Sequence, residues 1–124
     1  MVRTLGTVWG ILFVMGGVLG FVPALTKDQM FLGVFMVNTL HNLVHIASGV
    51  MFLLASNLGA RAARLWFQVF GVFYAALAAI GFQVRDGMIF GLIPNNRYDS
   101  WGHALLALVL LGIGFATSKE TAAA

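Results

Sequence analysis

Residues 62–83 read AARLWFQVFGVFYAALAAIGFQ and contain one charged side chain, Arg64, near the beginning. A helix that crosses the hydrocarbon core of a bilayer needs roughly 20 mostly apolar residues. This segment therefore predicts a transmembrane helix. Three other segments meet the same criterion, and short connections with most of the charged residues separate them. The four predicted spans cover about residues 5–25, 30–56, 62–83 and 98–117.

The composition of the whole chain supports membrane residence. Of its 124 residues, 60% are hydrophobic and 9% are charged, whereas a typical soluble domain is about 45–50% apolar and about 25% charged. A domain this small could not bury so much apolar surface in its own core. We therefore expect residues 1–124 to form one all-α domain, a transmembrane four-helix bundle with antiparallel up-down spans in a lipid bilayer.

Several functional classes are disfavoured by the residues that the chain lacks. It has no cysteine, so disulfides and thiolate metal sites are excluded. The 7 basic residues are scattered between apolar runs, whereas a nucleic-acid interface needs them clustered on one face. All four acids lie at predicted span ends, so no span offers the paired carboxylates of a typical hydrolytic site. We predict a protein that is not an enzyme and binds no nucleic acid.

The distribution of basic residues favours an orientation with both termini in the cytoplasm. Cytoplasmic connections of membrane proteins carry an excess of Lys and Arg. With the termini inside, the inner side would carry Arg3, Arg61, Arg64 and Lys119, and the outer side Lys27, Arg85 and Arg97. The outer basic residues each have an acid within a few positions in the sequence, whereas Arg61 and Arg64 are followed and preceded by apolar runs, which strengthens the bias.

Small residues form strips on two of the predicted spans. Helices in lipid associate through close packing of such residues, so each strip predicts a helix–helix contact. The strip on the first span is Gly6, Gly10, Gly17 and Gly20, and the one on the third span is Gly71, Ala75, Ala78 and Ala79.

The third connection contains an apolar patch, residues 88–93, which is too short to span a membrane. It ends in Pro94-Asn95-Asn96, which indicates a turn, and Asp99 is expected to cap the fourth span. We predict an interfacial segment folded over the mouth of the bundle, with a docking surface for another protein as the alternative.

Residues 38–49, NTLHNLVHIASG, place polar side chains inside the second span. Polar groups in a bilayer are costly and normally face the bundle interior, so we expect this polar face to point toward the third and fourth spans. His103, in the fourth span, should lie roughly 6–8 Å below the outer boundary and His41 roughly 15 Å below it, at 1.5 Å per residue. One helical face carries Asn38, His41, Asn42, His45, Ser48 and Gly49.

Three interpretations of this cluster remain open. It could be a structural hydrogen-bond network that ties helices together. It could be a ligand site in which His41, His45 and His103, with Asn38 and Asn42 beside them, bind a metal ion, haem or chlorophyll. It could also conduct protons or ions, although the acidic residues lie only at the ends of the predicted spans.

The chain contains three short motifs in a fixed order. They are Asn38-x2-His41-Asn42-x2-His45-x3-Gly49 in the second span, Gly59-Ala60-Arg61 before the third, and Pro94-x-Asn96-x2-Asp99-x3-His103 at the fourth. This pattern resembles a family of small four-span bacterial membrane proteins known only as a domain of unknown function. The resemblance covers essentially the whole chain and implies a four-helix bundle in a bacterial inner membrane. It implies no activity. Members of that family often have Leu where this chain has Gly102.

Small size and the lack of a soluble domain predict an accessory or assembly subunit of a larger membrane complex, or a homo-oligomer. The alternative is a cofactor-binding membrane protein that ligates haem, chlorophyll or a metal ion through His41, His45 and His103. The final residues, KETAAA, resemble the start of a peptide tag, and we assign them no function.

Overall fold

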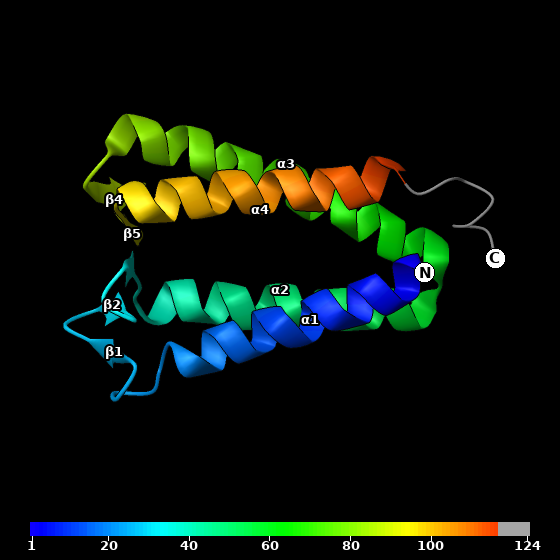
Figure 1. Ribbon diagram of the computed structural model, residues 1–124, viewed down its shortest axis with the longest axis horizontal. Coiled ribbons are helices and arrows are strands. Elements are labelled where there is room, and N and C mark those ends of the chain that lie inside the picture. Colours follow the sequence, from blue (N-terminus) through cyan, green and yellow to red (C-terminus); the bar gives the residue numbers. More distant parts are fainter. Residues whose placement is uncertain (117–124) are drawn as a thin grey trace.

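A computed structural model describes residues 1–116 of the chain, and the KETAAA tail and the predicted end of the fourth span at residue 117 lie outside the described residues. Four helices dominate it, and all are long and apolar enough to cross a membrane. The predicted all-α, four-span membrane fold is confirmed (Figure 1). The helices are α1 (Val2–Leu19), α2 (Thr39–Leu58), α3 (Ala60–Val84) and α4 (Arg97–Ala116).

The helices pack as two antiparallel hairpins, α1 on α2 and α3 on α4. Glycines allow the helix backbones to approach closely: a Cβ atom on Gly10 would lie 2.9 Å from the carbonyl oxygen of Gly49. A Cβ atom on Gly71 would lie 3.0 Å from the backbone nitrogen of Leu111. The glycine strip predicted on the first span is therefore its contact with α2. The strip on the third span is only partly a contact, because Ala79 is exposed.

The second helix begins at Thr39 rather than near residue 30, so the predicted boundary is wrong. The preceding residues form three short antiparallel strands, β1 (Thr26–Lys27), β2 (Met30–Phe31) and β3 (Phe35–Met36). Asp28 and Gln29 form the two-residue turn between β1 and β2, with φ of 53° and 62°, which matches the strand twist of a tight hairpin. The Asn38 side chain then accepts a hydrogen bond of 2.8 Å from the His41 backbone N–H and caps α2.

The connection between α3 and α4 contains a second hairpin, β4 (Gly87–Ile89) and β5 (Ile93–Asn95). It includes the apolar patch that was predicted not to span. Asn96, and not Asp99 as predicted, caps α4: the Asn96 side chain accepts from the Asp99 N–H at 2.9 Å. Asp99 Oδ2 accepts in return from the Asn96 N–H at 3.0 Å. This reciprocal pair is a capping box, which uses the residue three positions after the cap.

The two halves of the molecule are structural repeats. Each consists of a helix, a β-hairpin and a second helix, and both hairpins lie at the same end of the bundle (Figure 1). The pairs Gly33 and Gly91, Asn38 and Asn96, and His45 and His103 are each separated by 58 residues. Parallel repeats of this kind are related by an axis along the membrane normal.

Equivalent hydrogen bonds cross between the two repeats. Asn38 Nδ2 donates to the carbonyl oxygen of Leu92 in the second hairpin, at 2.8 Å. Asn96 Nδ2 donates to the carbonyl oxygen of Val34 in the first hairpin, also at 2.8 Å. Each helix-capping asparagine therefore ties its own helix to the loop of the other repeat, and together they join the hairpins across one end of the bundle.

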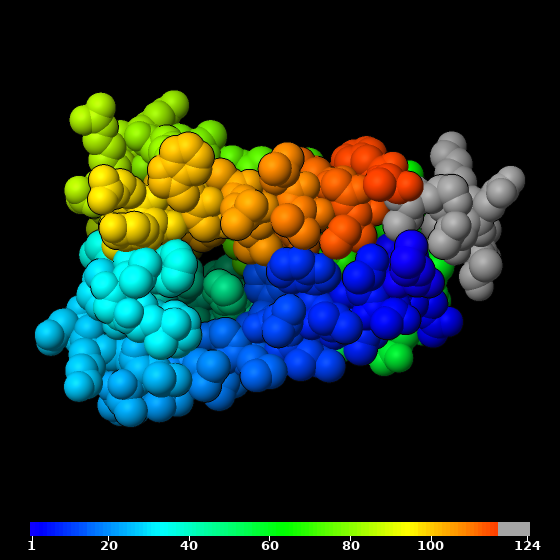
Figure 2. All heavy atoms as spheres, viewed as in Figure 1, coloured from blue at the N-terminus to red at the C-terminus, as the bar shows by residue number. Residues whose placement is uncertain are grey.

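The contacts between the two helix pairs, α1–α2 and α3–α4, are not symmetric. Helices α2 and α3 follow each other directly through Gly59 and pack together, whereas α1 and α4 make few contacts. A buried aromatic cluster fills the junction, with Phe52 ring centroids 5.7 Å from Phe13 and 5.0 Å from Phe67. Figure 2 shows the surface hollowed between α1, in blue, and α4, in orange.

Candidate functional site

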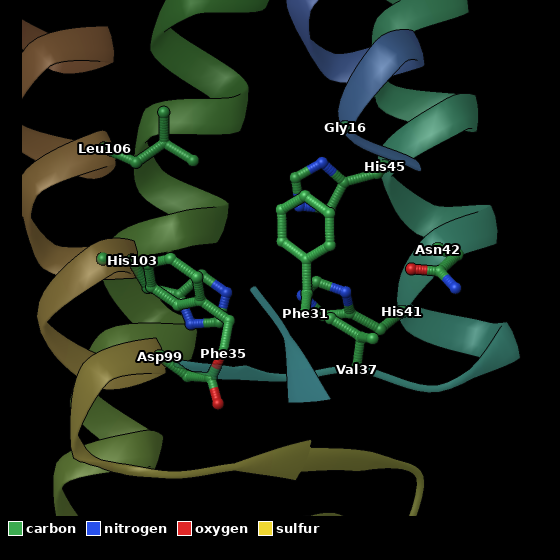
Figure 3. Close-up of a pocket in the computed structure, with 11 residues that line it drawn as sticks. Gly16, Phe31, Phe35, Val37, His41, Asn42, His45, Asp99, His103 and Leu106 are labelled. Carbon is green, nitrogen blue, oxygen red and sulfur yellow. The ribbon is translucent and has the colours of Figure 1, made fainter. Parts of the chain in front are cut away.

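A cavity of about 210 Å³ lies between the two repeats, near the end that carries the β-hairpins. Residues from α1, α2, α4 and the first hairpin line it, and Figure 3 shows the histidine rings and two phenylalanine rings reaching into it. Its walls are mostly apolar, with a few convergent polar groups, as is typical of small-molecule sites. The lining consists of Gly16, Phe31, Phe35, Val37, His41, Asn42, His45, Asp99, Gly102, His103 and Leu106.

The structure brings the three predicted histidines together. The ring centroids of His41 and His45, one turn apart on α2, are 4.9 Å from each other. The ring centroid of His103, on α4, is 6.3 Å from that of His41. Aromatic rings support them from behind: Phe13 lies 5.2 Å from His45, and Tyr74 lies 5.7 Å from His103, both measured between ring centroids. The site therefore combines imidazoles from both repeats.

The polar face of α2 was predicted to point toward α3 and α4. This prediction is only partly right, because part of the face points toward α1. His41 and His45 line the cavity, and Ser48 lies beside the hydroxyl of Tyr74 on α3. Gly49, in contrast, packs on α1, where a Cβ atom would lie 2.6 Å from the Gly10 carbonyl oxygen. The reason is that the glycine strip of α1 brings that helix against the same broad face. The polar face is thus divided between two neighbouring helices.

The two asparagines of the predicted site differ in position. Asn42 lines the cavity and is buried; its side chain lies against Gly20, which follows α1, and its backbone lies against Gly17 of α1. Asn38 does not line the cavity, because its side chain caps α2 and bonds to Leu92. Asn38 therefore holds the site's framework and does not belong to its wall.

The helix start behind the predicted depth of His41 is wrong. His41 lies in the first turn of α2, because the helix begins at Thr39. The predicted depth of roughly 15 Å assumed helical residues from 30 onward at 1.5 Å per residue. The strands between residues 26 and 36 take up that stretch of chain at the end of the bundle. The three histidines are consequently all close to the β-hairpins.

The buried nitrogens of the three rings lack protein partners. Nδ1 of His41, His45 and His103 is buried and makes no hydrogen bond of normal geometry within the described residues. The Asn42 side chain lies near His41 and the Phe13 backbone near His45, without forming such a bond. Buried polar groups in proteins are normally paired. A neutral imidazole offers one donor and one acceptor, so this cluster has unused hydrogen-bonding capacity.

The sequence reasoning missed several residues of the site. Asp99 was placed at a span end, yet it is 4% exposed and lines the cavity. Its Oδ2 accepts from the Met36 N–H at 3.1 Å, which fixes the first hairpin against α4. Phe31 and Phe35, assigned to a helix, project from that hairpin into the cavity. The internal repeat could have indicated that Asp99 belongs to the site, because Asp99 is the residue equivalent to His41 in the second repeat.

The geometry restricts the ligands that the site can hold. Within residues 1–116, no three or more histidine and acidic side chains are arranged to hold a metal ion. The predicted triad of His41, His45 and His103 is thus not a ready three-ligand metal site. The cavity of about 210 Å³ is also smaller than the roughly 300–1,000 Å³ of typical pockets for drug-sized ligands. A whole porphyrin or chlorin ring would not be enclosed by it.

The family is decided by the extent of one match. Residues 3–116 match the family model described as domain of unknown function DUF4383. The chain belongs to the DUF4383 family. This confirms the family resemblance found in the sequence. The DUF4383 match includes both repeats and all three histidines, so the cavity lies within the family domain. Comparison with curated proteins and with solved structures yields no match.

Proposed function

We propose that this DUF4383 protein is a non-catalytic ligand-binding protein of the bacterial inner membrane, with both termini in the cytoplasm. The observation that carries the proposal is the convergence of His41, His45 and His103 on one cavity between two repeats. Ionisable side chains within membrane spans are costly and usually functional. Three of them around one cavity favour a bound group over a chance arrangement.

The unpaired nitrogens favour this function over a purely structural network. A network that only ties helices together would pair each imidazole with a neighbouring side chain or carbonyl. Here Nδ1 of all three rings has no partner among the described residues, while two half-buried amides at the same end of the bundle do bond: Asn96 and Asn38 each donate to a loop carbonyl. Asn38 and Asn96 therefore provide structural hydrogen bonds between the repeats, and the histidines are left for a ligand.

Imidazoles suit several cofactor classes. A neutral ring can ligate haem iron, the magnesium of a chlorophyll or a metal ion, or it can donate a hydrogen bond to a carbonyl oxygen. A macrocycle would have to extend out of the cavity between α1 and α4. A metal ion would require the imidazoles to rearrange, since they are not positioned as a metal-binding group.

The test is to purify the chain in mild detergent from a bacterial membrane and identify what it carries. We expect a ligand at a fixed molar ratio, detected by absorption, by metal analysis or by mass spectrometry of an organic extract. His103→Leu should raise the dissociation constant about tenfold, the factor that corresponds to losing about 1.4 kcal/mol of binding free energy, and so lower the molar ratio of ligand to protein. The matched control is Leu108→Ala, on the exposed face of α4. A protein that carries no ligand dependent on the histidines contradicts the proposal.

A second role, as an accessory subunit of a larger membrane complex, is favoured by the tips of the hairpins. Phe90 and Leu32 occupy loop tips with exposed fractions of 78% and 58%. Phe90 belongs to the segment 88–93, for which a docking surface was the alternative prediction, and Leu32 is the equivalent residue of the first β-hairpin. We expect Phe90→Ser to reduce co-purification of a partner from gently solubilised membranes. Migration of the unaltered protein only as a free monomer on native gels would contradict this role.

A further inference from the structure

We infer that the histidine cavity binds the single-ring head group of a lipid-soluble quinone, which enters from the bilayer between α1 and α4. This inference rests on the proposed ligand-binding function and specifies its ligand class. It depends on where the cavity opens, how its other end is closed, how large it is and which groups line it.

The cavity opens on the side where the repeats do not close. If both sides were alike, α1 would pack on α4 as α3 packs on α2, but α1 and α4 make few contacts. Gly16 on α1 and Gly102 on α4 line the cavity from these two helices. Neither glycine has a side chain to narrow the gap, and Figure 2 shows the hollow between the two helices.

This opening faces lipid. Both flanking helices are among the four candidate membrane spans. Leu12 lies one turn before Gly16 and Leu105 one turn after Gly102, and these apolar side chains are 51% and 64% exposed. A ligand that passes between them must be dissolved in the bilayer, since the route is bordered by hydrocarbon.

The end of the cavity nearest the aqueous boundary is covered by the β-hairpins. The reciprocal bonds of Asn38 to Leu92 and of Asn96 to Val34 join the two loops. Asp99 adds a bond to the Met36 N–H, at 3.1 Å. Because these bonds tie both hairpins over the histidines, the lateral route is the favoured entrance.

The size of the cavity fits one ring. Its volume of about 210 Å³ is below the roughly 300 Å³ at which typical pockets for drug-sized ligands begin. A six-membered ring with small substituents can be enclosed, while a long apolar tail would stay between the lipid acyl chains outside the opening.

The lining chemistry fits a ring with oxygen acceptors at opposite edges. His45 and His103 are equivalent residues of the two repeats. His45 lines the cavity from α2 and His103 lines it from α4. A neutral imidazole can donate to a carbonyl oxygen or accept from a phenolic hydroxyl, so the pair can hold both the quinone and the quinol. Phe31 and Phe35 supply aromatic faces for the ring (Figure 3).

The experiment measures the binding of one probe to the protein in lipid nanodiscs by quenching of tryptophan fluorescence, and the binding of two further probes by their competition with it. The probes are a benzoquinone with a decyl tail, the decyl-tailed anthraquinone as a three-ring head group, and decylbenzene as an apolar control. We expect saturable binding of the benzoquinone, and affinity at least about tenfold lower for the other two, as expected from a lost hydrogen bond or a steric clash.

Variants then locate the site and the entrance. Gly102→Leu adds a side chain at the opening and should weaken benzoquinone binding about tenfold or more. The matched control, Gly112→Leu, lies on the same helix, where a Cβ atom meets nothing within 4 Å, and should bind normally. His45→Leu and His103→Leu should each lose binding. Thermal unfolding of every variant verifies that it is folded.

The outcomes separate this inference from the proposed function. If the purified protein carries a histidine-dependent haem, chlorin or metal and does not bind benzoquinone, the quinone inference is overturned and the ligand-binding function stands. If no histidine-dependent ligand of any kind is found, both fall. Benzoquinone binding that survives in folded His45→Leu and His103→Leu proteins also overturns the inference, because the probe then binds elsewhere.

Discussion

Gly49→Leu is expected to separate α1 from α2 and to lower the free energy of unfolding by about 4 kcal/mol or more, which places it among the most damaging single substitutions. A Cβ atom at this position would lie 2.6 Å from the carbonyl oxygen of Gly10 and 2.7 Å from the backbone nitrogen of Val14. Backbone atoms cannot rotate away as a side chain can. The two helices would have to move apart, and the close packing that holds membrane helices together would be lost.

The measurement is unfolding of the detergent-solubilised protein with increasing sodium dodecyl sulfate. Gly112→Leu is the matched control, since that position has nothing within 4 Å of an added Cβ atom. Both substitutions replace glycine by leucine in a helix interior and gain about the same helix propensity, so the difference between them reports packing. Equal unfolding midpoints for the two variants would refute the contact between Gly49 and Gly10.

Asp99→Ala is expected to release the first β-hairpin and to destabilise the protein by about 2–4 kcal/mol, the cost of losing two hydrogen bonds to a buried carboxylate. Asp99 Oδ2 accepts from the Met36 N–H at 3.1 Å and from the Asn96 N–H at 3.0 Å. The first bond joins the two repeats and the second completes the capping box of α4. Hydrogen exchange at the Met36 amide, followed by NMR in detergent micelles, should become faster.

Two other variants give this prediction its controls. Asp99→Asn keeps an acceptor oxygen, so it should retain much of the protection at Met36. Asp86→Ala removes a carboxylate from an exposed position in the connection after α3 and should leave both stability and exchange unchanged. Unchanged protection of Met36 in Asp99→Ala would show that the bond does not hold the hairpin.

Local patterns predicted the helices well because the bilayer imposes a simple requirement. A long apolar segment has to satisfy its own backbone groups, so α1 to α4 could be found by composition and length. The start of α2 could not be found in this way, because residues 30–37 are as apolar as the helix that follows. The strands at Met30 and Phe31 depend on a turn with positive φ at Asp28 and Gln29, and although aspartate is common in such turns, glutamine is not.

The candidate site was partly predictable for a related reason. Three histidines in apolar segments stand out, and the i,i+4 spacing of His41 and His45 places them on one helical face. The role of Asp99 could not be read locally, since its partner Met36 is distant in sequence. The repeat that relates His45 to His103 keeps few identical residues, and the structure made it visible through equivalent bonds of Asn38 and Asn96.

The sequence by itself determined a four-span membrane protein of the DUF4383 family with three histidines in its apolar segments. The tertiary structure alone decided which helices pair, that hairpins cover one end, and that the histidine cavity opens between α1 and α4. The reason is physical: transfer into lipid depends on each segment's own composition, whereas helix pairing depends on contacts between distant residues. Gly10 against Gly49 is one such contact, and neither residue specifies it alone.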